Sequence, residues 1–229
     1  VPLMLEREKF ADKVCEALQL PIRVPKLQDW EDLVDRFQHP EREVTIALVG
    51  KYIQLHDAYL SVAEALRHAA WAQDASAEIA WIDAEELEKP EGERLLSDLD
   101  GIIVPGGFGL RGTEGMLAAA RYARERHLPY FGICLGMQTA VIEFARDAAG
   151  LAGANSGEFD PASPHKVIDF MPGQSNEIDK GGTLRLGAYP CEIKAGTVME
   201  RCYGARSISE RHRHRYEFNN DYREALTQA

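Results

Sequence analysis

The stretch LPYFGICLGMQ, residues 128–138, decides the fold class of this chain. Its first half is an apolar run typical of a buried strand, and its second half begins an amphipathic helix. Gly132 and Gly136 flank Cys134 in a Gly-x-Cys-x-Gly pattern. A sharp strand-to-helix turn brings backbone segments close together, which side chains at the two glycine positions would oppose. The pattern therefore predicts a nucleophile elbow, with Cys134 at the carboxyl end of a strand.

Similar strand and helix patterns alternate through the central part of the sequence. Apolar runs predict buried strands at 44–50, 76–83, 100–107 and 128–134. Apolar residues at helical spacing predict helices over 57–71, 114–127 and 135–146. This alternation implies an α/β fold with a mostly parallel open sheet and helices on both faces.

The two ends of the sequence differ from the central pattern. Residues 1–20 have the spacing of one amphipathic helix, and a short helix is expected over 30–37 after a stretch with two prolines. We therefore expect a linker or the tail of another domain at 1–42 and the domain itself at 43–229. After Gly150 the sequence predicts a long loop over 153–183, with one strand at 167–170, and strands of an antiparallel extension at 184–193 and 205–218.

Composition limits the partners and the compartment. The formal net charge is -11, from 26 basic and 37 acidic side chains, which argues against general binding of nucleic acid. No apolar run is long enough to predict a membrane span, and the first residues do not read as a secretory signal. The 4 cysteines form no C-x-x-C pair, so we expect free thiols, no metal site and a cytoplasmic protein.

The predicted turn suits a cysteine nucleophile. The helix that begins at Leu135 would supply free backbone N–H groups and a partial positive charge, which favour thiolate over thiol. The same N–H groups can stabilise the oxyanion that forms when a thiolate attacks an acyl carbon. A small buried residue at a strand end is the alternative for Cys134, but the two glycines favour the nucleophile. A second glycine-rich turn, PGGFG at 105–109, follows a neighbouring strand.

These motifs resemble the class I glutamine amidotransferases, in which PGGFG is followed by GICLGMQ. Longer stretches resemble the amidotransferase domain of the CTP synthase family, and together they cover almost the whole chain. They are VTIALVGKYIQLHDAYLSVAEAL (44–66), VPGGFGLRGTEGM (104–116), GICLGMQ (132–138), GGTLRLGAYPC (181–191) and ERHRHRYEFN (210–219). The resemblance implies a flavodoxin-like fold, and it implies that the segment 1–42 ends a synthetase domain and links it to this one.

The resemblance also implies a role for particular residues. Cys134 matches the nucleophile that takes ammonia from glutamine, and the backbone N–H groups of Gly107 and Leu135 match the oxyanion hole. The residues matching L-glutamine contacts are Gly107, Leu135, Gly136, Met137, Gln138, Glu158 and Arg215. Within that set, Glu158 corresponds to the partner of the α-amino group, and a guanidinium at Arg215 suits the α-carboxylate. The GTP effector is expected at Arg111, Gly112 and Glu114.

In the family, the ammonia aminates UTP to CTP on a synthetase domain that uses ATP and Mg²⁺, and the full enzyme is a homotetramer. The sequence departs from the family at one point, because it contains no His-Pro-Glu motif to supply the base. We therefore expect these 229 residues by themselves to have little glutaminase activity. Two alternatives remain, a catalytically dead binding or regulatory module with this fold and another class I amidotransferase.

Two further features have simple structural readings. Gly50-Lys51 follows a strand but lacks the rest of a phosphate-binding loop, so we expect a strand-end turn. In the basic run 211–215, alternation along a strand would place His212 and His214 on one face and the arginines on the other.

Overall fold

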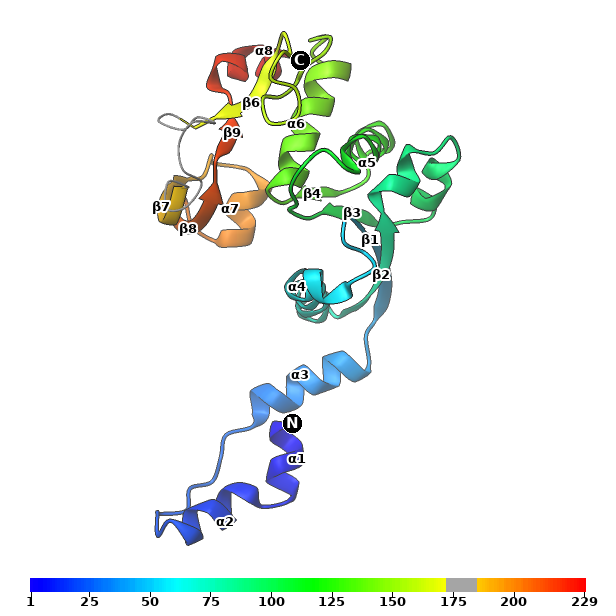
Figure 1. Ribbon diagram of the computed structural model, residues 1–229. Helices are drawn as coiled ribbons and strands as arrows, with labels where there is room; N and C mark the ends of the chain where they lie inside the picture. The colour runs from blue at the N-terminus through cyan, green and yellow to red at the C-terminus, as the bar shows by residue number, and fades with distance from the viewer. Residues whose placement is uncertain (172–184) are drawn as a thin grey trace.

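A four-stranded parallel sheet forms the centre of the computed structural model, which describes residues 1–171 and 185–229 (Figure 1). Its strands are β1 (Arg42–Gly50), β2 (Ala75–Asp83), β3 (Gly101–Val104) and β4 (Tyr130–Gly132). They lie in the order β2-β1-β3-β4, and each neighbouring pair is parallel. This is the order of flavodoxin-like folds, so the predicted fold class is confirmed. Strands β3 and β4 are shorter than the apolar runs that predicted them.

Helices cover both faces of this sheet, as the alternating sequence pattern predicted. They are α4 (Leu60–Ala72) on one face and α5 (Thr113–Arg126) and α6 (Leu135–Asp147) on the other. In β1, Ala47 and Val49 pack into the cluster that contains α5, while Leu48 packs into the cluster beside α4. All three side chains are fully buried, and burying a side chain such as Val or Leu stabilises the fold by roughly 1.5–3 kcal/mol.

Short 3-10 helices complete the connections at the carboxyl end of the sheet. They are η1 (His56–Tyr59), which forms the first turn of the helix predicted at 57–71, and η2 (Ala84–Glu88) and η3 (Gly92–Leu96) after β2. Helix α5 packs tightly on η2 at Gly115, where an added Cβ would lie 1.7 Å from the carbonyl oxygen of Ala84. Only glycine permits this approach, so Gly115 sets the position of α5.

An ion pair joins α5 to α6. The guanidinium of Arg124 donates two hydrogen bonds to Oε1 of Glu143, at 3.0 Å from Nε and 2.7 Å from NH2. The Glu143 side chain is only 3% exposed, so its carboxylate depends on this partner. The pair therefore fixes the orientation of α6, the helix that begins directly after Cys134.

The carboxyl-terminal part forms two small sheets, of which the three-stranded one packs against α6. One contains β5 (Asn155–Ser156), β6 (Lys166–Phe170) and β9 (Tyr216–Phe218), and the other pairs β7 (Arg185–Glu192) with β8 (Ser207–His214). Short helices α7 (Val198–Tyr203), η4 (Asn220–Tyr222) and α8 (Arg223–Gln228) complete this part. The β6–β9 and β7–β8 pairs are antiparallel, which confirms the predicted antiparallel extension.

The prediction of one strand over 205–218 is wrong. The chain changes partner at Arg215, because β8 pairs with β7 while β9 pairs with β6. The alternation predicted within β8 is confirmed, since the rings of His212 and His214 lie on one face with centroids 5.6 Å apart. Arg215 lies after the end of β8 and does not follow that alternation. Of the loop predicted over 153–183, the part from 172 onward lies outside the described residues.

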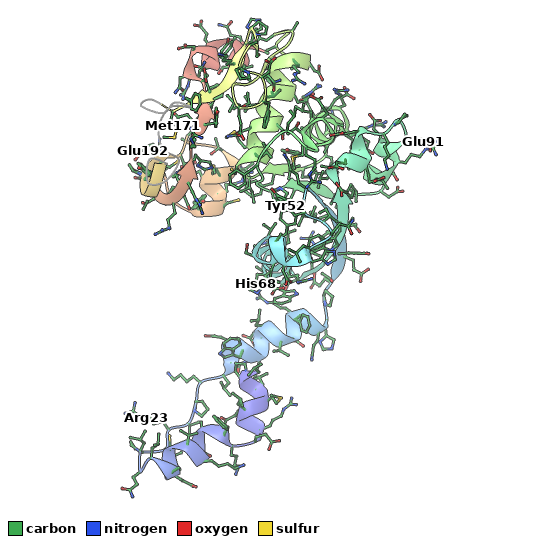
Figure 2. The ribbon with its side chains drawn as sticks, in the orientation of Figure 1. Arg23, Tyr52, His68, Glu91, Met171 and Glu192 are labelled. Atoms are coloured by element: carbon green, nitrogen blue, oxygen red, sulfur yellow. The ribbon has the colours of Figure 1, made fainter. Side chains whose placement is uncertain are left out.

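The first helices form an arm that reaches away from the sheet (Figure 1). They are α1 (Pro2–Arg7), α2 (Phe10–Ala17) and α3 (Gln28–Gln38), and no residue in them is buried. The single helix predicted over 1–20 is wrong, because Lys9 has a left-handed backbone (φ 50°) that separates α1 from α2. Figure 2 shows Arg23 at the far end of the arm.

At its other end the arm rests on α4. The ring of Phe37 meets the ring of Trp71 edge-on, with centroids 5.1 Å apart, and Arg36 pairs with Asp74 at 3.4 Å. Within the described residues, no helix is long and apolar enough to cross a membrane.

Candidate active site

The carboxyl ends of β1, β3 and β4 bring three segments together. Lys51 follows β1, the turn 105–109 follows β3, and Cys134 follows β4. A Cβ added at Gly106 would lie 3.3 Å from Cβ and 3.7 Å from Sγ of Cys134, so the glycine-rich turn lies directly against the thiol. Open α/β sheets place their sites at this edge. The prediction that the two glycine-rich turns are neighbours is therefore confirmed.

Cys134 has the strained backbone of a nucleophile elbow. Its dihedrals are φ 54° and ψ -109°, and it is the N-cap of α6. A Cβ at Gly132 would lie 2.5 Å from the carbonyl carbon of Gly136, and one at Gly136 would lie 1.9 Å from the carbonyl oxygen of Val104. Both glycines are needed for the close backbone approach that the sequence pattern predicted.

Opposing effects act on the pKa of Cys134. Burial of the half-exposed thiol raises its pKa above the ordinary cysteine value. A hydrogen bond from the Leu135 backbone N–H lowers the pKa, and the negative charge of Glu158 raises it. The expected effect of the helix terminus is therefore present, but burial outweighs it and the net direction is upward. A base close to Cys134 would favour its ionisation at neutral pH.

This raised pKa leads to a testable pH dependence. In the 229-residue chain, alkylation of Cys134 by iodoacetamide should rise about tenfold per pH unit from pH 7 and still be rising at pH 9, because only thiolate reacts. Peptide mass mapping separates Cys134 from the other three cysteines. If the alkylation rate reached a plateau below pH 7, the helix terminus would lower the pKa of Cys134 by more than burial raises it.

The segment expected to bind glutamine forms the first turn of α6. Leu135, Gly136 and Gln138 are buried, while Met137 is 39% exposed and reaches the surface. The Nε2 of Gln138 donates to the carbonyl oxygen of Tyr216 at 3.4 Å. This contact connects the start of α6 to β9, so the three-stranded sheet of β5, β6 and β9 borders the elbow.

Glu158 and Arg215 flank strands of the three-stranded sheet, since Glu158 follows β5 and Arg215 precedes β9. The exposed carboxylate of Glu158 follows β5, and its charge acts on Cys134, Lys51 and Tyr216. The guanidinium carbon of Arg215 lies 5.6 Å from the ring centre of Phe170, whose ring stacks on Tyr216 at 4.4 Å. The charge of Glu158 thus reaches the thiol, while Arg215 lies beside the ring of Phe170 in this sheet.

The three residues expected to bind GTP line one open hollow with Glu85 and Glu88, but their contacts differ. Arg111 pairs with Glu85 at 2.7 Å, and its second nitrogen donates to the carbonyl oxygen of Lys51 at 2.7 Å. Gly112 has a left-handed backbone and is the N-cap of α5. Glu114 instead lies 3.5 Å from Arg146 of α6. Of the three, Arg111 contacts the segment beside the elbow.

Lys51 is the residue that sequence reasoning missed at this site. Its Nζ donates to the carbonyl oxygens of Phe108, at 3.3 Å, and Gly109. The predicted strand-end turn accounts for its backbone but not for these contacts. The available signal was its position, since a charged residue directly after a fully buried strand must find partners at the site edge.

The described contacts of the histidines lie away from Cys134. For example, His56 stacks on Trp81, His39 pairs with Asp35, and His165 meets Tyr222 edge-on. Within the described residues, no group of three or more His, Cys, Asp or Glu side chains could hold a metal ion.

Known proteins match both the sequence and the fold. The family model of class I glutamine amidotransferases matches residues 54–228. The CTP synthase of Carboxydothermus hydrogenoformans is 57% identical over 227 residues, covering 99% of this chain and 42% of that protein. The CTP synthase of a Synechococcus species is 55% identical, covering 97% of this chain and 41% of that protein. The chain thus spans less than half the length of these relatives.

A solved structure is similar over most of its own length. It is described as the glutaminase domain of Trypanosoma brucei CTPS with bound acivicin, and it shares 43% of its sequence with this chain at a TM-score of 0.75. The similarity covers 81% of this chain and 72% of that one. Because the family model covers most of the sequence and the solved relative has the same fold, the chain belongs to the class I glutamine amidotransferases, among the glutaminase domains of CTP synthases.

Proposed function

We propose that this chain is the glutaminase part of a CTP synthase, which hydrolyses L-glutamine and supplies the ammonia that converts UTP to CTP. The observation that carries the proposal is the strained elbow, which holds Cys134 against the turn 105–109 at the sheet edge. The similarity to CTP synthases along nearly the whole chain supports the proposal that the ammonia is used to convert UTP to CTP.

The reaction follows from a thiolate at this position. Sγ of Cys134 attacks the side-chain amide carbon of glutamine, and the backbone N–H groups of Gly107 and Leu135 stabilise the oxyanion. The C–N bond then breaks, and the leaving nitrogen takes a proton to depart as ammonia. Water attacks the resulting thioester, which releases glutamate and returns the thiol. Glu158 and Arg215 hold the α-amino and α-carboxylate groups of the substrate.

The proton transfers need a base that these 229 residues do not supply through a His-Pro-Glu motif. We infer that the 229 residues alone turn over glutamine several orders of magnitude more slowly than a complete triad would. In the same proposal, ATP and Mg²⁺ serve the synthetase domain, residues 1–42 connect to it, and the full protein works as a cytoplasmic homotetramer. GTP acts at the hollow beside Arg111.

Covalent labelling tests the glutamine site without requiring turnover. A glutamine-mimicking chloroketone should modify Cys134 with a rate that saturates as its concentration rises, because it binds before it reacts. L-Glutamine should slow this labelling, and D-glutamine should not, since Glu158 and Arg215 recognise one arrangement of the α-groups. Labelling that neither saturates nor responds to L-glutamine would contradict the proposal and favour a non-catalytic module.

A further inference from the structure

Lys51 is buried behind the glycine-rich turn. Its residue is 4% exposed, and its Nζ donates to two carbonyl oxygens of the turn, those of Phe108 and Gly109. The stem of the side chain also packs on the turn, because a Cβ added at Gly107 would lie 3.4 Å from Cδ of Lys51 and 3.3 Å from Cδ2 of Leu135. Gly107 is therefore held between Lys51 and the first residue of α6.

The backbone of Lys51 is itself fixed from two directions. Its N–H donates to the hydroxyl of Tyr59 at 3.0 Å, and its carbonyl oxygen accepts from Arg111 at 2.7 Å. Tyr59 can lie this close because Gly50 has no side chain, since a Cβ there would be 2.6 Å from the hydroxyl oxygen. Tyr52, labelled in Figure 2, also donates its backbone N–H to Tyr59. Lys51 thus extends from a rigid strand end to the turn.

We propose that Lys51 is a positioning residue that holds the turn 105–109 in the conformation required to stabilise the oxyanion of glutamine cleavage. This inference rests on the proposed function. The N–H of Gly107 belongs to the peptide group that joins it to Gly106 in this short turn, and Lys51 binds the carbonyl oxygens of the next two residues, which limits how far the turn can move. An oxyanion donor must be in place before the reaction, because a small displacement lowers the rate strongly.

The lysine is retained at a cost to stability. Burial, and then the positive charge of Arg111, lower the pKa of Lys51 from 10.5 to about 8, while Glu158 and Glu88 act in the opposite direction. The folded chain therefore binds this proton less tightly than the unfolded chain does, and below pH 8 the charge opposes folding. A side chain kept only for stability would not need an ammonium here. Replacement by methionine should leave the fold at least as stable.

The test compares Lys51→Met and Lys51→Arg with the unchanged chain, using the glutamine-mimicking chloroketone. Lys51→Met should lower the limiting rate of Cys134 labelling about tenfold or more, because the turn loses its two tethers. The concentration giving half-maximal labelling should change less than about twofold, since the contacts to the α-groups remain. Iodoacetamide alkylation and Tm should not fall. Lys51→Arg should recover part of the rate, because a guanidinium can also donate to two carbonyls.

A matched substitution controls for the loss of a lysine in general. Lys89→Met removes an exposed lysine that pairs with Glu86, and it should leave the limiting rate unchanged. An unchanged limiting rate in Lys51→Met, or a lower Tm in that variant, would overturn the positioning role. If the unchanged chain itself shows no saturable labelling, the proposed function fails instead, so the two failures are distinguishable.

Discussion

Under the proposed function, replacing Cys134 with alanine is expected to abolish glutamine-dependent CTP formation, with a loss of at least about 10⁴-fold in a protein that carries this chain together with a synthetase domain. In the proposed function the thioester forms on this thiol, and alanine has no group that could form it. The measurement is CTP formation from UTP and ATP with glutamine as the nitrogen donor. Ammonia release from glutamine should fall in parallel.

Ammonium chloride provides the internal control for this prediction. Because free ammonia bypasses glutamine cleavage, Cys134→Ala should still form CTP when ammonium chloride replaces glutamine. Cys202→Ala removes an exposed cysteine of α7 and should leave both activities unchanged. Glutamine-dependent activity in Cys134→Ala within tenfold of the unchanged protein would refute the nucleophile assignment.

Gly136→Ala is expected to have the largest effect on stability, lowering the free energy of unfolding by about 3 kcal/mol or more. The added Cβ would lie 1.9 Å from the carbonyl oxygen of Val104, which belongs to the last residue of β3. This clash involves backbone on both sides, so side-chain rotation cannot relieve it. Alanine favours a helix over glycine by about 1 kcal/mol, which is too little to compensate. Urea denaturation measures the change.

Gly204→Ala is the matched control, because it adds the same methyl group without the clash. Gly204 ends α7 with φ 63°, and a Cβ there would meet no atom within 4 Å. Its cost should be only the left-handed backbone penalty, about 1–2 kcal/mol. Equal destabilisation by the two substitutions would show that the backbone approach between α6 and β3 is not the cause.

The helices and strands of the central sheet could be predicted because their buried apolar residues recur in the sequence with the spacing of a helix or form a continuous run typical of a buried strand. Each of the four runs that predicted strands overlaps one strand, and the predicted helices coincide with α4, α5 and α6 to within a few residues. Periodicity reports which side chains are buried, but not which strand they pair with. It therefore missed the change of partner at Arg215, and it missed the left-handed Lys9 that divides the first helix.

The elbow could be predicted for a similar reason. Gly132 and Gly136 are glycines because backbone atoms occupy the space of their side chains, so a local pattern encodes a three-dimensional contact. The GICLGMQ and PGGFG motifs thus identified the thiol and its neighbouring turn from sequence. The roles of Glu158 and Arg215 came from resemblance, and the structure adds that the charge of Glu158 acts on Cys134 and that Arg215 lies over the ring of Phe170.

The sequence by itself determined the α/β class, the position of the elbow and the choice of Cys134 as the candidate nucleophile. Each of these depends on the spacing of residues within short segments. Only the tertiary structure decided the direction of the Cys134 pKa shift and the place of Lys51. The pKa depends on how deeply surrounding elements bury the thiol, and the contacts of Lys51 join two strand ends that are far apart in sequence. Distances across a fold and the exclusion of water are properties of packing, which no local pattern records.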